Sequence, residues 1–312
     1  MSCCETFGIF SAFVVSIQLL FGVVRYLYEN IYGPRFGQQK SFKSYGKWAL
    51  VTGATDGIGK EYARQLAQKG LNVILVSRTL SKLETVAKEI RESFNVETAV
   101  IDVDFTSTDI YDKIKDRVKG KEIGILVNNV GMCYSTPDFF LAVPEREKFI
   151  QDLINCNILS VPMMCSIILP QMVQRKRGII GSMSSAVPAA NYCVYSGSKA
   201  FVDKFSDDLS AEYEHDGIIV QSILPGPVAT NMIKTKQGSF IVPTPKDYVR
   251  AALATVGFAG HTNVVLPHML LQLLAQLANF VAPSLSRFIT LKSIKLHRDR
   301  HIKQGLYTPA AN

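Results

Sequence analysis

Short apolar runs alternate with helical patterns from Trp48 onward, which is the pattern of a parallel α/β sheet. The runs predict strands at residues 48–52, 72–77, 97–103, 123–127, 179–183 and 220–224. Between them, we expect a helix over 59–69, a second over 81–94 that a capping box of Ser81 and Glu84 starts, and a third that begins near Thr108. The pattern therefore predicts a doubly wound parallel sheet with helices on both faces.

An uncharged apolar run from Phe7 to Val24 precedes this region. As a helix it would reach roughly 27 Å, just enough to cross a hydrocarbon core, and Tyr26 and Tyr28 follow where an interfacial aromatic belt is expected. Residues 25–47 hold five Lys and Arg against one Glu. This excess of basic residues predicts that the rest of the chain faces the cytosol. A cleaved signal peptide is the main alternative and a buried helix the other. No Lys or Arg precedes the run, and no clear small-x-small cleavage site follows it.

The pattern loosens beyond Gly226. We expect a mobile segment over 230–245, and then a helix between Pro267 and Pro283 that is too short to span a bilayer. This helix is a candidate wall of a substrate pocket, a second contact with the membrane surface, or a core helix.

The formal net charge is +8, and the stretch from Arg287 to Lys303 holds six Lys and Arg against one Asp. No recognition motif accompanies it, so nucleic acid is a poor partner. Anionic headgroups suit it better, and the phosphates of an acidic substrate are the alternative. With 47% hydrophobic and 19% charged residues, the chain is not disordered. Its six cysteines show no C-x-x-C spacing, so we expect reduced thiols and no metal site.

A glycine-rich turn, Thr52-Gly53-Ala54-Thr55-Asp56-Gly57-Ile58-Gly59, follows the first strand and opens a helix. Gly53 permits a tight turn, while Gly57 and Gly59 let backbone and helix approach a pyrophosphate, which the helix N-terminus attracts. This arrangement predicts a Rossmann-type dinucleotide site. The second strand ends in Ser77-Arg78, with Lys82 nearby and no acid, which favours the 2′-phosphate of NADP(H).

Tyr195 and Lys199 lie one helical turn apart, so phenol and ammonium project from the same helix face. A free tyrosine has a pKa of about 10 and is a poor acid at neutral pH. We expect the neighbouring cation to lower that pKa, as general acid catalysis requires.

The order of the motifs, with Asn128-Asn129-Val130-Gly131 and Pro225-Gly226 completing the set, resembles that of the short-chain dehydrogenases/reductases. The sequences of residues 47–60, 124–132 and 198–202 resemble those of the membrane-bound 17β-hydroxysteroid dehydrogenase / very-long-chain 3-oxoacyl-CoA reductase family. The resemblance covers roughly residues 1–285. It implies an enzyme of the endoplasmic reticulum membrane that uses NADPH to reduce a ketone on a lipid-like substrate. The substrate would be a long-chain 3-oxoacyl-CoA of fatty acid elongation, a 17-ketosteroid, or both. A homodimer is the oligomer that the family implies, and an inactive scaffold that keeps the cofactor fold is the alternative function.

By this resemblance, Tyr195 donates the proton, Lys199 lowers its pKa and bonds the nicotinamide ribose, and Asn157 holds a relay water, with Asn155 as a weaker candidate. Asp104 would bond the adenine amino group, Asn129 would lie along the cofactor, and Val228 and Thr230 would close over the nicotinamide. The full set of expected cofactor residues is Gly53, Thr55, Asp56, Gly57, Ile58, Gly59, Arg78, Lys82, Asp104, Asn129, Tyr195, Lys199, Val228 and Thr230.

The serine that orients the carbonyl is ambiguous. Strand register, counted from Gly178, selects Ser185, with Ser184 next to it, whereas the family's distance from the tyrosine selects Ser182. We favour Ser185, because a loop loses residues more easily than a strand slips. The loop 186–194 is then three residues short of the family spacing.

The chain divides into a membrane anchor (1–28), a linker (29–46), an NADP(H)-binding Rossmann catalytic domain (47–262), and a C-terminal helical segment for substrate or membrane contact with a basic tail (263–312).

Overall fold

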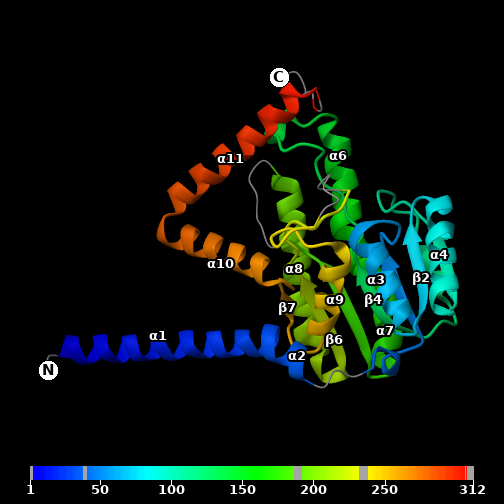
Figure 1. Cartoon of the computed structure of the whole chain (residues 1–312), viewed down its shortest axis with the longest axis horizontal. Coiled ribbons are helices and arrows are strands. Elements are labelled where there is room, and N and C mark those ends of the chain that lie inside the picture. Colours follow the sequence, from blue (N-terminus) through cyan, green and yellow to red (C-terminus); the bar gives the residue numbers. More distant parts are fainter. Residues whose placement is uncertain (1–2, 38–40, 186–191, 232–237, 306, 308–312) are drawn as a thin grey trace.

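The computed structural model describes residues 3–37, 41–185, 192–231, 238–305 and 307. Its centre is a seven-stranded parallel sheet in the order β3-β2-β1-β4-β5-β6-β7 (Figure 1). The strands are β1 (Trp48–Thr52), β2 (Asn72–Ser77), β3 (Thr98–Asp102), β4 (Ile123–Asn128), β5 (Gly178–Met183), β6 (Ile218–Ile223) and β7 (His261–Thr262). Strand order reverses between β1 and β4, and ligands bind beyond the carboxyl ends of the strands at such a point.

Helices cover both faces of the sheet and create two cores. The first core holds α3 (Gly57–Gln68), α4 (Leu80–Phe94) and α9 (Pro245–Thr255), and the second holds α5 (Tyr111–Val118), α7 (Ser160–Gln174) and α8 (Cys193–Tyr213). Successive strand residues face opposite sides, so Ala49 and Val51 belong to the first core and Leu50 to the second. Burial on both faces explains why the strands appear in the sequence as continuous apolar runs.

The predicted doubly wound fold is confirmed, and the predicted strands agree with the observed ones within two residues at each end. β7 was missing from the prediction, because a strand of two residues has no recognisable pattern. The predicted capping box was wrong. The first turn of α4 already closes when Leu83 N donates to Thr79 O, so Ser81 lies inside the helix. The expected mobile segment 230–245 lies partly outside the described residues.

The helix α1 (Cys3–Leu27) extends away from the body of the molecule (Figure 1). Its aromatic side chains do not pack on the domain, since Phe7, Phe10 and Phe21 are 72%, 64% and 68% exposed.

The segment predicted to be a linker packs on the domain. It contains the π-helix η1 (Tyr28–Tyr32), α2 (Gly33–Phe36) and the 3-10 helix η2 (Phe42–Ser44). The side chain of Phe42 belongs to the first core, and the backbone of α2 lies so close to Phe258 that a Cβ on Gly33 would come within 2.7 Å of its ring. These contacts fix the point at which α1 leaves the domain.

One helical run among the described residues, 146–174, has the length and apolarity needed to cross a membrane. It comprises α6 (Arg146–Leu153), the π-helix η4 (Ile154–Leu159) and α7. Half of the most apolar stretch of this run is buried, and Met164 and Ile168 belong to the second core. Packing against the sheet therefore explains its composition.

The chain ends in two helices that diverge from the domain and return to it, α10 (Leu266–Val281) and α11 (Pro283–Lys303) (Figure 1). The first turn of α10 is anchored, because buried His268 accepts a hydrogen bond from Gly226 N at 3.1 Å through Nδ1. Farther along, Leu274, Phe280 and Phe288 are 64%, 87% and 61% exposed. Only the start of α10 therefore behaves as a core helix.

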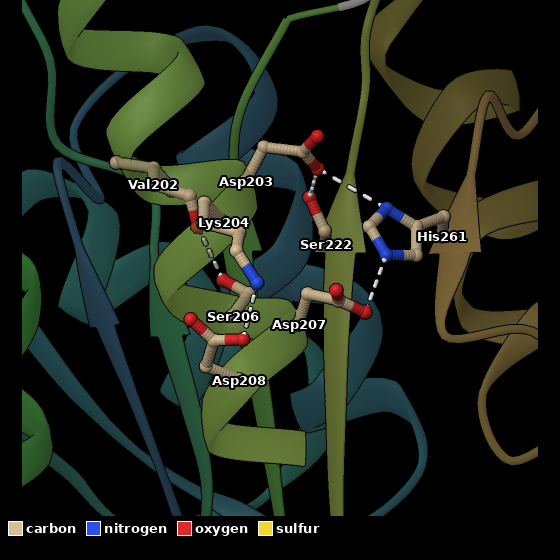
Figure 2. A network of polar contacts seen from close by, with 8 residues as sticks. All are labelled: Val202, Asp203, Lys204, Ser206, Asp207, Asp208, Ser222 and His261. Carbon is tan, nitrogen blue, oxygen red and sulfur yellow. Dashed lines mark hydrogen bonds and ion pairs between the residues drawn. The ribbon is translucent and has the colours of Figure 1, made fainter. Parts of the chain in front are cut away.

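A histidine ties the edge strand β7 to α8, as Figure 2 shows. His261 contacts Asp203 through Nδ1 at 3.2 Å and Asp207 through Nε2 at 3.0 Å. Ser222 on β6 donates to the same Asp203 carboxylate at 2.5 Å. The two carboxylates raise the pKa of His261 to about 9, from an ordinary value of 6.5. Because the folded-state pKa lies above the unfolded one, the stabilisation is complete below about pH 6.5 and is lost as the pH rises through about 9.

We expect His261→Gln to remove this pH dependence. The melting temperature of the wild type should fall between pH 6.5 and 9 by more than that of the variant, because only in the wild type does the folded state hold a proton that the unfolded state has released. Thermal unfolding followed by circular dichroism across this range measures the difference. The exposed histidine His215, changed to Gln, is the control and should retain the wild-type slope. Equal slopes in wild type and His261→Gln would contradict the assignment.

Candidate active site

The glycine turn packs so closely that Gly53 and Gly59 leave no room for a side chain. Gly53 has a φ of +66°, and a Cβ there would lie 2.9 Å from Asn129 Nδ2. A Cβ on Gly59 would lie 2.2 Å from Gly53 O. Asp56 caps α3 by accepting from Gly57 N at 2.8 Å. The remaining N–H groups of the first turn of α3 lie where Gly57 and Ile58 line a cavity, which a pyrophosphate can approach closely.

The residues Thr52 and Asn129 brace this turn against the end of β4. Thr52 Oγ1 accepts from Asn129 N and Val130 N, both at 3.0 Å. Asn129 Nδ2 in turn donates to Thr52 O at 2.9 Å and Gly53 O at 3.3 Å. The side chain of Asn129 thus holds the two strand ends together, in addition to lining the cavity described next.

A cavity of about 670 Å³ opens at the carboxyl ends of the strands. Residues predicted to bind the cofactor that line it are Gly53, Asp56, Gly57, Ile58, Arg78, Asp104, Asn129 and Thr230. The prediction missed Ser77, Val103, Phe105, Thr106, Val130, Gly131, Met132, Lys148, Asp152, Cys156 and Asn231. Most of these end β2 or follow β3 or β4 closely, and this position could have identified them. Lys148 and Asp152 come from α6, and no local sequence pattern predicts that they line the cavity.

Other predicted cofactor residues lie behind or beside the cavity. Thr55 Oγ1 lies 3.2 Å from Ser77 Oγ and joins the turn to β2. Gly59 and Val228 are buried, while Lys82 is exposed on α4 and does not line the cavity.

The far end of the cavity is shaped by a tight turn after β3. Asp104 Oδ1 accepts from both the backbone N and the hydroxyl of Thr106, each at 3.0 Å. Asn155 Nδ2 donates to Thr106 O at 2.8 Å, so this asparagine supports the turn. This hydrogen bond commits the Asn155 amide to the turn after β3.

The residues Tyr195 and Lys199 meet on α8 as their spacing predicts, but the electrostatics differ from the expectation. Lys199 is buried, its Nζ donates to Met183 O at 2.8 Å, and Nζ lies 5.7 Å from the centroid of the Tyr195 ring. Burial lowers the pKa of Lys199 to about 8. Burial also raises the pKa of Tyr195, contrary to the expectation that Lys199 lowers it. Removal of the phenol from water outweighs the cation, whose ammonium is bonded elsewhere.

Asn157 lies in the π-helix η4, a distortion that often accompanies functional sites. Its Oδ1 accepts from Met132 N at 2.8 Å, and its Nδ2 donates to Met132 O at 2.9 Å and to Ser198 Oγ at 3.1 Å. A Cβ on Gly131 would lie 3.5 Å from both Asn157 Oδ1 and Lys199 Nζ. The asparagine, the lysine and the cavity therefore converge at Gly131.

The three candidate serines have different surroundings. Ser182 lies inside β5 and its hydroxyl accepts from Asn128 Nδ2 at 3.3 Å. Ser184 is buried and donates to Lys199 O at 2.7 Å. Ser185 follows the strand and is only half-buried, while 186–191, most of the shortened loop, lies outside the described residues.

Together these features fit a nicotinamide dinucleotide. The glycine turn and the start of α3 suit the pyrophosphate, Arg78 and Asp104 lie toward the adenosine end, and Tyr195 and Lys199 lie beyond Gly131 at the other end.

The chain matches known proteins over most of its length. The family model described as short chain dehydrogenase matches residues 47–239. A very-long-chain 3-oxoacyl-CoA reductase of Anas platyrhynchos is 50% identical over 243 residues, covering 77% of this chain and 78% of the relative. The Homo sapiens protein of that name is 49% identical over 229 residues, covering 72% and 73%.

Solved structures agree. A short-chain dehydrogenase from Sphingobium yanoikuyae in complex with NADPH is 28% identical with a TM-score of 0.59, covering 66% of this chain and 82% of that one. A 7beta-hydroxysteroid dehydrogenase is 25% identical with a TM-score of 0.66, covering 72% and 89%. The chain therefore belongs to the short-chain dehydrogenase/reductase family, in the branch that holds the very-long-chain 3-oxoacyl-CoA reductases, and is an oxidoreductase that works with a nicotinamide cofactor.

Proposed function

We propose that the protein reduces the 3-keto group of long-chain 3-oxoacyl-CoA thioesters with NADPH, at the endoplasmic reticulum membrane. The observation that carries this proposal is the convergence of Lys199 and Asn157 at Gly131, with Tyr195 beside Lys199, next to a cavity fitted to a dinucleotide. The names of its relatives supply the substrate class.

NADPH held in the cavity lined by Gly53, Arg78 and Asn129 would supply a hydride to the carbonyl carbon, while the residues of the chain act on the carbonyl oxygen. Since burial raises the pKa of Tyr195, its phenol keeps its proton at neutral pH and can donate it to that oxygen. Lys199, with its pKa of about 8, carries a charge at neutral pH that stabilises negative charge as it develops nearby. Asn157 holds the backbone at Met132 and the hydroxyl of Ser198, and so fixes the end of β4 against α8.

We assign the orientation of the carbonyl to Ser185. Ser182 lies inside β5 and Ser184 is buried, so neither side chain is accessible to a substrate. Ser185 is the first serine beyond them that is not fully buried.

A panel of 3-oxoacyl-CoAs and 17-ketosteroids, with NADPH oxidation as the measurement, tests the function. We expect turnover of long-chain 3-oxoacyl-CoAs, and Tyr195→Phe should lower kcat about 100-fold or more, since it removes the proton donor. Ser185→Ala should lower kcat about 100-fold, because a donor to the carbonyl oxygen is lost. Ser182→Ala is the matched control and should retain most of the activity.

Turnover of ketosteroids alone would assign the other substrate class. A folded protein that binds NADPH and reduces no ketone would instead favour a scaffold.

The choice of NADPH over NADH rests on Arg78, which is exposed at the end of β2 and lines the cavity. A guanidinium there can hold the 2′-phosphate through two parallel N–H groups. We expect Arg78→Ala to weaken NADPH binding about 10- to 100-fold, the value of a charge-assisted hydrogen bond or two, and to leave NADH binding nearly unchanged. Titration of cofactor fluorescence measures both constants, and an unchanged ratio would refute the role of Arg78.

Membrane attachment is proposed for α1, which would span the bilayer with the catalytic domain in the cytosol. The exposed apolar surface of α1 supports this, and its length of 25 residues suits a hydrocarbon core. The corner between α10 and α11 extends from the same side of the body as α1 (Figure 1). It exposes Phe280, Val281 and Leu285, and basic residues follow on α11, as expected of a second contact with anionic headgroups.

We expect the full chain to remain with membranes after alkaline carbonate extraction. The double variant Phe13→Lys, Phe21→Lys should be released from the membrane, because a charge at the centre of a spanning helix costs about 3 kcal/mol. Leu80→Lys, which changes an exposed leucine of α4, is the control and should not alter the distribution. Retention of the double variant would contradict the anchor, and fluorescence microscopy with a reticulum marker tests the compartment.

A further inference from the structure

The loop after β4 buries a carboxylate that the reaction does not use. Asp138 is 1% exposed, and its Oδ1 accepts from Phe139 N at 2.8 Å. Its other partners come from the opposite end of the chain. Arg298 Nε forms an ion pair with Oδ1 at 2.5 Å, and Tyr307 donates to Oδ2 at 2.6 Å. A buried carboxylate is strongly unfavourable without such partners, so the loop adopts this position only while the C-terminal segment holds it.

Further contacts join the same two segments. Thr136 Oγ1 lies 2.7 Å from His301 Nδ1, and the Arg298 guanidinium lies over the Phe139 ring, 5.7 Å from its centroid. Figure 1 shows the end of α11 beside α6, which follows this loop in the chain. We call the contacts of Asp138 and Thr136 with Arg298, His301 and Tyr307 the C-terminal latch.

The latched loop also reaches the catalytic helix. The Tyr134 ring lies 5.5 Å from that of Tyr192, which lies 6.4 Å from that of Tyr195. Tyr134 OH accepts a hydrogen bond from Val194 N at 3.3 Å, and its ring packs on Phe149 of α6 at 4.6 Å. The loop therefore lies directly beside the start of α8, on the side of Tyr134 and Tyr192.

We propose that Asp138 is a positioning residue. By holding the loop against Arg298 and Tyr307, it makes the loop and the C-terminal latch one wall of the site for the acyl chain. Contact with this wall gives the enzyme its selectivity for long substrates. This inference rests on the proposed function. A 3-keto group at Tyr195 has the dinucleotide cavity on the Gly131 side, so the rest of the acyl chain extends on the side of Tyr134 and Tyr192. There the loop presents the exposed apolar side chains Phe139, Phe140 and Leu141. A short acyl group ends before it reaches them, whereas a long one contacts them.

The test compares 3-oxohexadecanoyl-CoA with acetoacetyl-CoA on the full chain. We expect Asp138→Asn to raise KM for the long substrate about tenfold, because hydrogen bonds to a charged group are lost. The kcat/KM for acetoacetyl-CoA and the Kd for NADPH should stay within about twofold, since neither ligand reaches the latch. Tyr307→Phe, which removes one hydrogen bond and keeps the ion pair, should raise the long-chain KM about threefold. Asp299→Asn removes the neighbouring carboxylate of α11 and is the control, with wild-type values expected.

Combining Asp138→Asn with Arg298→Met should be no worse than the more severe single change, because both remove one interaction. Hydrogen exchange of 133–142 provides a readout that does not depend on activity, and we expect it to accelerate in Asp138→Asn and Tyr307→Phe. Unchanged exchange overturns the latch, and equal loss for both substrates overturns its role in selectivity. If the wild type reduces no 3-oxoacyl-CoA, the proposed function fails, and with it the selectivity, while exchange still decides whether the latch exists.

Discussion

The hydrogen bonds between Thr52 and Asn129 join the carboxyl ends of β1 and β4 where the strand order reverses. The rest of the site depends on this junction. It holds the glycine turn so close to β4 that a Cβ on Gly53 or Gly59 would overlap its neighbours. It also sets the direction in which β4 ends, and so where Gly131 and Met132 meet Asn157. The cofactor half and the catalytic half of the site are thus two sides of one strand junction.

Burial controls the chemistry of the catalytic half. The ammonium of Lys199 donates a hydrogen bond to the last residue of β5, and this contact anchors α8 to the carboxyl end of that strand. Desolvation then acts on both titratable groups in the direction of the neutral form, raising the pKa of Tyr195 and lowering that of Lys199. A phenol that keeps its proton suits a reductase, which must deliver a proton to the carbonyl oxygen.

The two ends of the chain act outside the Rossmann core. The exposed helix α1 and the corner of α10 and α11 provide apolar surface on one side of the molecule (Figure 1). α11 then returns to the loop after β4, where Asp138 is buried against Arg298 and Tyr307. The C-terminal segment therefore connects the region proposed to meet lipid with the side of the site proposed to receive the acyl chain.

The sequence by itself determined the sheet, the glycine turn and the pairing of Tyr195 with Lys199, because each leaves a local pattern in the chain. Strands buried on both faces produce apolar runs, and one helical turn brings the tyrosine and lysine to the same face. Only the tertiary structure decided features that depend on burial or on distant segments. These are the direction of the Tyr195 pKa shift, the use of Asn155 to support Thr106, the buried contacts of Ser182 and Ser184, and the partners of Asp138. Their physical reason is shared, since desolvation and long-range contacts arise only when the chain has folded and leave no periodic pattern along it.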